Sequence, residues 1–259
     1  MTRPTFSRAR LACLLAALAG CGRLGIPDVR TDPDGAAEAD ADRRADGPGP
    51  GPDAAGPADA ASGLLCGDPV RVDTVDVPTV SIGSQCWTAR NLDRGVRLPL
   101  GTPPSQVGQV EKYCYLDDPA RCASEGGLYL WSEMMAQAVT EGARGICPAG
   151  WHIPSDAEWM LLEASLGMSG ADQQGFGFRG TIAARLLVGG DSGFGARYSG
   201  IATDTRVFLG ENTDAFFWAS TEGLAGANGL SRHLVMGFGG VERLGYDKEN
   251  AFAVRCVRD

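Results

Sequence analysis

Apolar residues recur at helical spacing in the segment that follows Pro154. The positions at i, i+3 and i+7 are Trp159, Leu162 and Leu166. This spacing predicts one buried face of an α-helix that stops at Gly167. Ser155 and Glu158 have the spacing of a capping box, in which each side chain accepts a hydrogen bond from the other residue's amide. We therefore expect a capped helix after Ser155, with Asp156 and Glu158 at the positive end of its dipole.

The rest of the pattern consists of shorter apolar runs and glycine-rich stretches. A second helix is expected over residues 131–139. Short β-prone runs predict strands at residues 79–82, 215–219, 233–238 and 251–257. Residues 170–200 are rich in glycine and are expected to form a long loop with little regular structure. The elements together predict an α+β domain with a mainly antiparallel sheet, two helices and long Gly-rich loops.

The first 20 residues have the order of a secretory signal. An arginine-containing start precedes the apolar run 11–19, which is about half the roughly 20 residues that span a bilayer. Small residues then precede Cys21, an order typical of bacterial lipoproteins, whose signal is cleaved before a cysteine that carries lipid. We predict a lipoprotein signal peptide over residues 1–20 and lipidation of Cys21. The alternative is an ordinary signal with a coincidental cysteine.

Lipidation predicts that the rest of the chain is extracytoplasmic and tethered to a membrane. Every apolar run after residue 21 is broken by a charged residue, Gly or Pro within about ten residues, well short of a membrane span. Gly22 stands where inner-membrane lipoproteins tend to have Asp. The prediction is therefore an outer-membrane lipoprotein of the cell envelope.

Residues 21–63 have the composition of a disordered acidic linker. They consist mainly of Ala, Asp, Gly and Pro without any aromatic residue, so they cannot bury enough apolar surface to offset the entropy of ordering. Nine acidic residues and three Arg lie between Asp28 and Asp59, so most of the formal net charge of −9 is in the linker. This charge extends the tether. The lack of a basic cluster argues against nucleic acid as a partner.

Residues 64–259 are long enough for one domain with its own core. They contain six of the eight cysteines, and an even number in an exported domain predicts disulfides. Six cysteines allow 15 pairings, among which sequence alone does not choose. Spacing favours Cys114–Cys122 and Cys66–Cys86, with Cys147–Cys256 as the remainder. No Cys-x-x-Cys pair is present, which argues against a metal site.

A series of short motifs runs in order through residues 82–257. It includes Ile-Gly-Ser-Gln-Cys-Trp at 82–87, Cys-Pro-Ala-Gly-Trp-His-Ile-Pro-Ser at 147–155, Phe-Trp-Ala-Ser-Thr-Glu at 217–222 and Val-Arg-Cys-Val at 254–257. These motifs resemble the Fibrobacter succinogenes major paralogous domain over nearly all of residues 64–259. That family consists chiefly of exported, often lipid-anchored proteins of undefined activity. The resemblance therefore implies a location and a fold, with little chemistry.

The Pro-Ser-Asp-Ala-Glu-Trp helix start and the closing Val-Arg-Cys strand are also similar, more loosely, to the C-type-lectin-like fold. This similarity includes its branch around formylglycine-generating enzymes. It implies a disulfide between a cysteine at a helix start and one in the last strand, which supports Cys147–Cys256. Cys86 departs from the family pattern, which more often has another residue there, and a local bond to Cys66 would explain the departure.

The chain offers few groups for catalysis. His152 and His233 are its two histidines, and any Ser-His-Asp arrangement must use one of them; we expect His152 to be packed and His233 to be exposed or satisfied in a strand. Paired cysteines leave no thiol nucleophile. The carboxylates considered for a sugar-hydrolysing pair are Glu158, Glu211, Asp214 and Glu222. The prediction is that the protein is not an enzyme, with a formylglycine-generating type or a glycan-active hydrolase as the alternative.

Oxygen-bearing side chains flank the aromatic run 216–218. The candidate ligand-binding residues are Glu211, Asn212, Asp214, Glu222 and Asn228. Such groups suit calcium, but the Glu-Pro-Asn, Gln-Pro-Asp and Trp-Asn-Asp signatures of sugar-binding lectins are absent. We therefore predict no cofactor and keep calcium as the alternative. The five tryptophans are expected to be core residues rather than a sugar-stacking surface.

These observations favour a lipid-anchored envelope protein that displays a binding or adhesion domain. Its predicted ligand is extracellular polysaccharide or another envelope protein. A purely structural envelope protein is the third hypothesis, and it predicts neither a pocket nor an exposed aromatic cluster.

Overall fold

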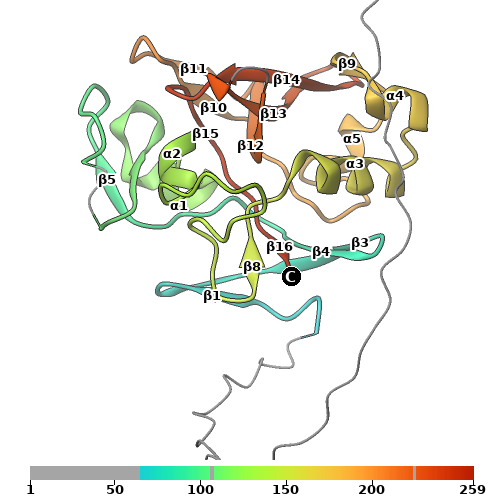
Figure 1. The fold of residues 1–259 in the computed structure, drawn as a ribbon, viewed down its shortest axis with the longest axis horizontal. Helices are drawn as coiled ribbons and strands as arrows, with labels where there is room; N and C mark the ends of the chain where they lie inside the picture. The colour runs from blue at the N-terminus through green and yellow to red at the C-terminus, as the bar shows by residue number, and fades with distance from the viewer. Residues whose placement is uncertain (1–64, 106–107, 224–225) are drawn as a thin grey trace, which may run out of the picture. The chain divides into compact units, whose positions relative to one another are not determined.

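The computed structural model describes residues 65–105, 108–223 and 226–259 (Figure 1). The expected signal peptide, the lipidation site Cys21 and the linker over 21–63 lie outside these residues. All described residues belong to one compact unit, Gly56–Asp259.

The largest sheet is mostly antiparallel. Its strands follow the order β7-β15-β10-β12-β13-β14-β9, and β11 pairs with β10 off this path. The pair β10 and β12 is parallel, at Gly200 and Ala215. The three longest strands are β12 (Asp214–Glu222), β13 (Asn228–Val235) and β14 (Val241–Asp247). The shorter ones are β7 (Tyr129–Leu130), β9 (Gly177–Arg179), β10 (Ser199–Ala202), β11 (Phe208–Glu211) and β15 (Ala251–Phe252).

Three smaller sheets complete the strand structure of the described residues. An antiparallel sheet has the order β3 (Thr79–Ile82), β4 (Gln85–Thr88), β16 (Val257–Arg258) and β8 (Trp151–His152). The other two are the antiparallel pair β1 (Val70–Val72) and β2 (Val75–Val77) and the parallel pair β5 (Val96–Leu98) and β6 (Glu111–Tyr113). The last residues of the chain thus pair between β4 and β8.

The helices are short except for one. They are α1 (Pro119–Glu125), α2 (Trp131–Met134), α3 (Asp156–Ser165), α4 (Gly170–Gln174), α5 (Ala183–Leu186) and the 3-10 turn η1 (Tyr115–Asp117). Helix α3 has the expected capping box, since Ser155 Oγ accepts from the Glu158 amide at 3.3 Å and Glu158 Oε2 accepts from the Ser155 amide at 2.8 Å. In Figure 1, α2, α3 and α5 lie between the large sheet and the four-stranded sheet.

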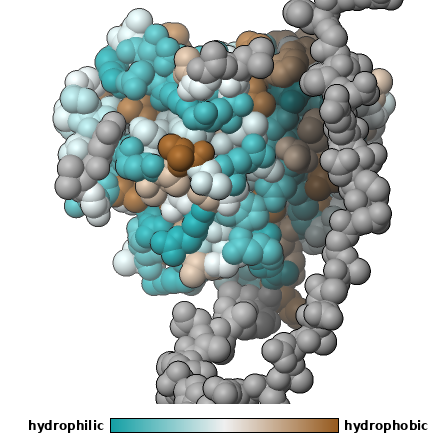
Figure 2. All heavy atoms as spheres, viewed as in Figure 1, coloured by the Kyte–Doolittle hydropathy of each residue, from teal (hydrophilic) through white to brown (hydrophobic). Residues whose placement is uncertain are grey.

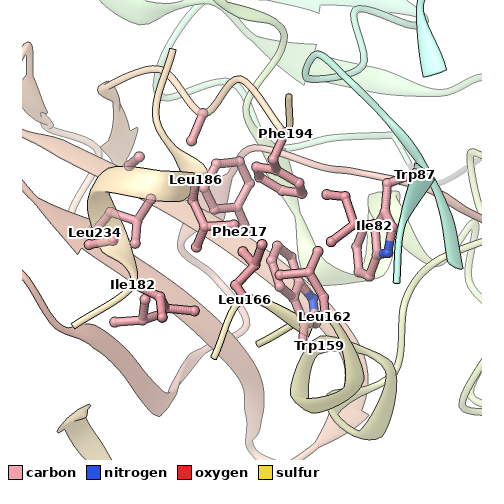
Figure 3. Packing of buried hydrophobic residues seen from close by; sticks show 14 of the residues in the cluster. Ile82, Trp87, Trp159, Leu162, Leu166, Ile182, Leu186, Phe194, Phe217 and Leu234 are labelled. Carbon is pink, nitrogen blue, oxygen red and sulfur yellow. The ribbon is translucent and has the colours of Figure 1, made fainter. Parts of the chain in front are cut away.

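An aromatic cluster joins these layers (Figure 3). Trp87 of β4, Trp159 of α3, Phe217 of β12 and Phe194 in the segment before β10 have ring centroids 4.9 to 5.9 Å apart where they meet. Such aromatic contacts stabilise a core beyond the effect of buried area alone. All five tryptophans are buried, which confirms that they are core residues.

A buried ion network also fixes α3 to the large sheet. Arg232 of β13 lies 2.8 Å from Asp156 and 2.6 Å from Glu163, measured between the nearest nitrogen and oxygen atoms. Arg179 of β9 makes two hydrogen bonds to Glu163, and Arg243 of β14 contacts both oxygens of Asp156. Because buried charges are tolerated only when they are paired and hydrogen-bonded, this network sets the position of α3.

Three disulfides are present among the described residues. They join Cys66 to Cys86, Cys114 to Cys122 and Cys147 to Cys256, so the disulfide-bonded domain and its expected pairing are confirmed. The third bond connects residues 109 apart in the sequence and holds the last strand to the segment before β8.

The structure corrects several predicted elements. Helix α2 ends at Met134, far short of residue 139, because Ala136 and Gln137 have φ of 48° and 63°. The strand expected at 233–238 begins at Asn228 and ends before the turn at Gly237. The strand expected at 251–257 is divided into β15 and β16. Residues 170–200 contain α4, β9 and α5, so the expected loop is partly regular.

Candidate ligand pocket

A pocket of about 320 Å³ opens beside the start of β10. Four separate segments form it: the end of α1, the residues after α5, the residues before β10 and the turn between β11 and β12. Its lining includes Glu125, Leu187, Val188, Arg197, Tyr198 and Asn212. We call this site the β10 pocket.

Backbone hydrogen bonds hold the pocket segments together. The Val188 amide donates to the Ala196 carbonyl at 3.0 Å, and the Ala196 amide donates to the Leu186 carbonyl at 2.8 Å. The Asn212 amide donates to the Tyr198 carbonyl at 2.8 Å. The backbone of the pocket wall is therefore fixed, and the side chains at its rim project from defined positions.

Asn212 occupies a position that few residue types accept. Its φ is 64°, in the left-handed region that Asn tolerates better than most residues. The residue is exposed, and its amide side chain makes no hydrogen bond within the described ranges. The tight turn thus presents an amide with free donors and acceptors at the pocket.

Glu125 and Glu211 lie on either side of one guanidinium. Arg121 Nη1 is 2.8 Å from Glu211 Oε1 and 3.9 Å from Glu125 Oε1. The Glu125 carboxyl is mostly buried, and its Oε2 has no hydrogen-bond partner among the described residues. Burial raises the pKa of Glu125, and the charge of Glu211 raises it further against the opposing charges of Arg121 and Arg197. The pocket lining therefore contains one carboxyl, Glu125, that holds a proton more readily than usual, and the nearby Glu211 carboxylate is paired with Arg121.

The remaining polar groups at the pocket are uncommitted. Arg197 is exposed, and its side chain makes neither an ion pair nor a hydrogen bond to any described residue. The Tyr198 hydroxyl is likewise unbonded in the described part of the chain, and burial, together with the charge of Asp214, raises the pKa of this phenol. Val188 provides an apolar wall, with 55% of its surface exposed.

The five candidate ligand-binding residues do not form one site. Asn212 lines the β10 pocket and Glu211 pairs with Arg121 beside it. Asp214 accepts a hydrogen bond from Thr213 and contacts His233 Nε2 at 2.7 Å. Glu222 and Asn228 lie at the other end of β12, where Glu222 pairs with Lys248. The nine-residue strand β12 separates the two groups of candidates.

The candidate carboxylates have different partners. Glu158 contacts Ser155 and His152, whereas Glu211 contacts Arg121. The carboxylate beside Glu211 is Glu125, which the sequence analysis did not include. No group of three or more His, Cys, Asp and Glu side chains is placed to hold a metal ion in the described ranges.

Both histidines are held between two carboxylates. His152 contacts Asp259 at 2.6 Å through Nδ1 and Glu158 at 2.7 Å through Nε2. His233 contacts Glu242 at 3.0 Å and Asp214 at 2.7 Å, and its ring stacks on Phe216 with centroids 3.7 Å apart. Each imidazole therefore has both nitrogens engaged.

Exposed aromatic residues gather elsewhere on the domain. Phe178 of β9 packs edge to face on Phe238 with ring centroids 4.7 Å apart, and both side chains are about half exposed. Phe176 lies nearby in sequence and contacts the Arg243 guanidinium at 4.3 Å. On the face that Figure 2 shows, hydrophilic residues predominate and hydrophobic residues form small separate spots.

Comparison with known proteins identifies one family. A model described as the Fibrobacter succinogenes major domain matches residues 80–258. No curated protein and no solved structure matches the chain. In the described ranges, no helix has the length and apolar character required to cross a membrane.

Proposed function

The chain belongs to the Fibrobacter succinogenes major domain family, and on this premise we propose that it is a lipid-anchored envelope protein that displays an extracytoplasmic binding domain. In this proposal Cys21 carries the lipid, the outer membrane is the anchor, and the domain binds extracellular polysaccharide in the β10 pocket. Three disulfides among the described residues support export, since such bonds persist in oxidising compartments.

The observation that carries the binding proposal is the set of uncommitted polar groups at one concavity. Arg197, Tyr198 and Asn212 offer charged, phenolic and amide groups beside an apolar wall. Ligand pockets combine these features: an apolar lining and a few convergent polar groups that orient the ligand. A solvated loop would not require three such side chains from two segments to meet at one pocket.

A C-type-lectin-like arrangement is part of the same proposal. Mostly antiparallel sheets, few helices and a disulfide from the segment before α3 to the segment before the last strand support it. The pocket and the exposed Phe178–Phe238 pair also favour binding over a purely structural role, which predicts neither feature.

The test is a polysaccharide array probed with the full-length protein, purified in detergent with its lipid and disulfides intact. We expect binding to at least one polysaccharide, unchanged by a calcium chelator, and weakened at least about tenfold by Asn212→Gly, which keeps the left-handed turn but removes the amide. Asn228→Gly at the far end of β12 is the matched control and should bind like the wild type. Failure to bind any polysaccharide would overturn the proposal in favour of a protein partner.

A glycan-active hydrolase is the second candidate, favoured by one observation. Glu125, whose pKa is raised by burial, lies near Glu211, which pairs with Arg121; two carboxyl groups in different environments are the arrangement that glycoside hydrolysis uses. Release of reducing ends from a bound polysaccharide, lost in both Glu125→Gln and Glu211→Gln, would establish it. Tight binding without release of reducing ends would exclude it.

A further inference from the structure

We propose that the β10 pocket selects acidic saccharides, with Arg197 pairing with the carboxylate of a uronic acid unit. This inference rests on the proposed function, because it names the class of polysaccharide that the same site would bind.

The two arginines near the pocket differ in what they contact. Arg121 is engaged by Glu211 at 2.8 Å and by Glu125 at 3.9 Å, so its charge is used within the protein. Arg197 lies in the lining and is exposed, and its guanidinium has no ion-pair or hydrogen-bond partner in the described part of the chain. A guanidinium forms bidentate hydrogen bonds with a carboxylate, and this geometry gives both strength and orientation.

The charge balance of the pocket favours an anionic ligand. The Glu211 carboxylate is neutralised by its contact with Arg121. Burial and the nearby Glu211 raise the pKa of Glu125, which reduces the negative charge that an acidic ligand would meet. The Arg197 guanidinium, which makes no ion pair with a described residue, then provides a positive charge at the site.

The neutral groups match the rest of a sugar ring. The Tyr198 hydroxyl and the Asn212 amide can both donate and accept hydrogen bonds, as sugar hydroxyls require, and neither has a side-chain hydrogen bond to a described residue. Val188 and Leu187 form an apolar wall that suits the C–H face of a ring. A pocket of about 320 Å³ is at the lower end of ligand-pocket sizes, so we expect it to hold a single unit or a chain end.

Other ligand classes use less of the site. A neutral saccharide would leave the Arg197 charge without a partner. A compact inorganic anion would pair with Arg197 but would have no use for the apolar wall or the Asn212 amide. The uronic acid unit is therefore the class that engages Arg197, the two neutral polar groups and the apolar wall together.

The experiment measures the affinity of the full-length protein in detergent for matched oligosaccharides. The probes are trimers of galacturonate, glucuronate and mannuronate, each compared with its methyl ester, which keeps the ring and removes the charge. We expect at least one acid trimer to bind about tenfold or more tightly than its ester, as a charge-assisted pair implies. Arg197→Gln should abolish this preference, and Arg197→Lys should retain part of it.

The control is Arg71→Gln, which removes an exposed arginine on β1 whose partner is Asp76. It should leave the preference unchanged, and because Arg197 has no described partner, its variants should unfold at the wild-type urea midpoint. Equal binding of acid and ester, still weakened by Asn212→Gly, would overturn this inference and leave the proposed function standing. Binding of no saccharide would overturn both, and preference for an Asp-Glu hexapeptide over every trimer would replace the saccharide with a protein ligand.

Discussion

Individual charged residues of the buried ion network contribute strongly to the stability of the fold. Asp156 lies between Arg232 and Arg243 with little exposure. Burial raises the pKa of this carboxyl, but the hydrogen bonds from Arg243 and the charge of Arg232 outweigh burial and lower it overall. The folded state therefore favours the ionised form of Asp156.

We predict that Asp156→Asn lowers the free energy of unfolding by about 3–5 kcal/mol, because it leaves two guanidinium groups without their charge partner. Urea denaturation with the disulfides intact measures the change. Asp191→Asn is the control, since Asp191 pairs with Arg185 at the exposed surface and should leave the urea midpoint unchanged. Equal effects of the two substitutions would contradict the prediction.

The contacts of His152 predict how the stability of the fold depends on pH. Its hydrogen bond to Glu158 raises the pKa of the imidazole against the effect of burial, and Asp259 raises it further. Because the pKa of His152 is higher in the folded state, its contacts stabilise the protein fully at pH values below the ordinary pKa of 6.5. This stabilisation is lost as the pH rises through the folded pKa. The pKa of Glu158 is lowered, because hydrogen bonds from His152 and Ser155 outweigh the opposing effect of burial. Its contribution is therefore lost as pH falls below its ordinary 4.5 and through the folded pKa.

We therefore expect the melting temperature of the wild type to fall between about pH 6 and pH 9, and that of His152→Gln to fall less. Thermal denaturation followed by circular dichroism at both pH values measures the difference. Parallel pH profiles for the two proteins would show that the His152 contacts do not stabilise the fold.

Among the elements, α3 depends most visibly on its first turn. The helix carries Trp159 into the aromatic cluster and Glu163 into the buried ion network. We predict that Ser155→Ala, which removes one half of the capping box, lowers the free energy of unfolding by about 1 kcal/mol. Ser169→Ala at the cap of the exposed five-residue α4 should have a smaller effect in the same urea denaturation experiment. A larger effect at Ser169 would contradict this account.

The contrast between α3 and its neighbours explains how much of the fold the sequence predicts. Helix α3 has a cap, three apolar residues in phase and a glycine after it, so every local signal agrees. Strands such as β7 and β15 have two residues each and exist because they pair with one another. Elements of two to five residues contain too few periods of a hydrophobic pattern to be recognised, so tertiary contacts set them, as in residues 170–200.

The same limit applies to the pocket at the scale of the whole molecule. Glu211 and Asn212 were recognised as candidates because polar groups beside an aromatic strand are visible locally. Glu125, Arg197 and Tyr198 reach the pocket from separate segments, and nothing in their immediate sequence marks them. The pocket is a property of how α1, α5 and the β11–β12 turn meet, which no single segment contains.

Two of the disulfides affect different properties of the molecule, one mainly its global stability and the other mainly the geometry of the pocket. The chain-entropy model gives roughly 4–5 kcal/mol for Cys147–Cys256, which closes a long loop, and roughly 2–3 kcal/mol for Cys114–Cys122, whose partners are eight residues apart. The short bond, however, anchors α1, which brings Arg121 and Glu125 to the pocket.

We predict that changing both Cys147 and Cys256 to Ser destabilises the protein more than the same change at Cys114 and Cys122, as measured by urea denaturation. Well below either denaturation midpoint, the Cys114/Cys122 variant should lose more saccharide affinity, because α1 is no longer tied to the segment before η1. If the Cys147/Cys256 variant loses more of both stability and affinity than the Cys114/Cys122 variant, the pocket depends on the global fold alone. The opposite orders expected here would show that α1 shapes the pocket independently of overall stability.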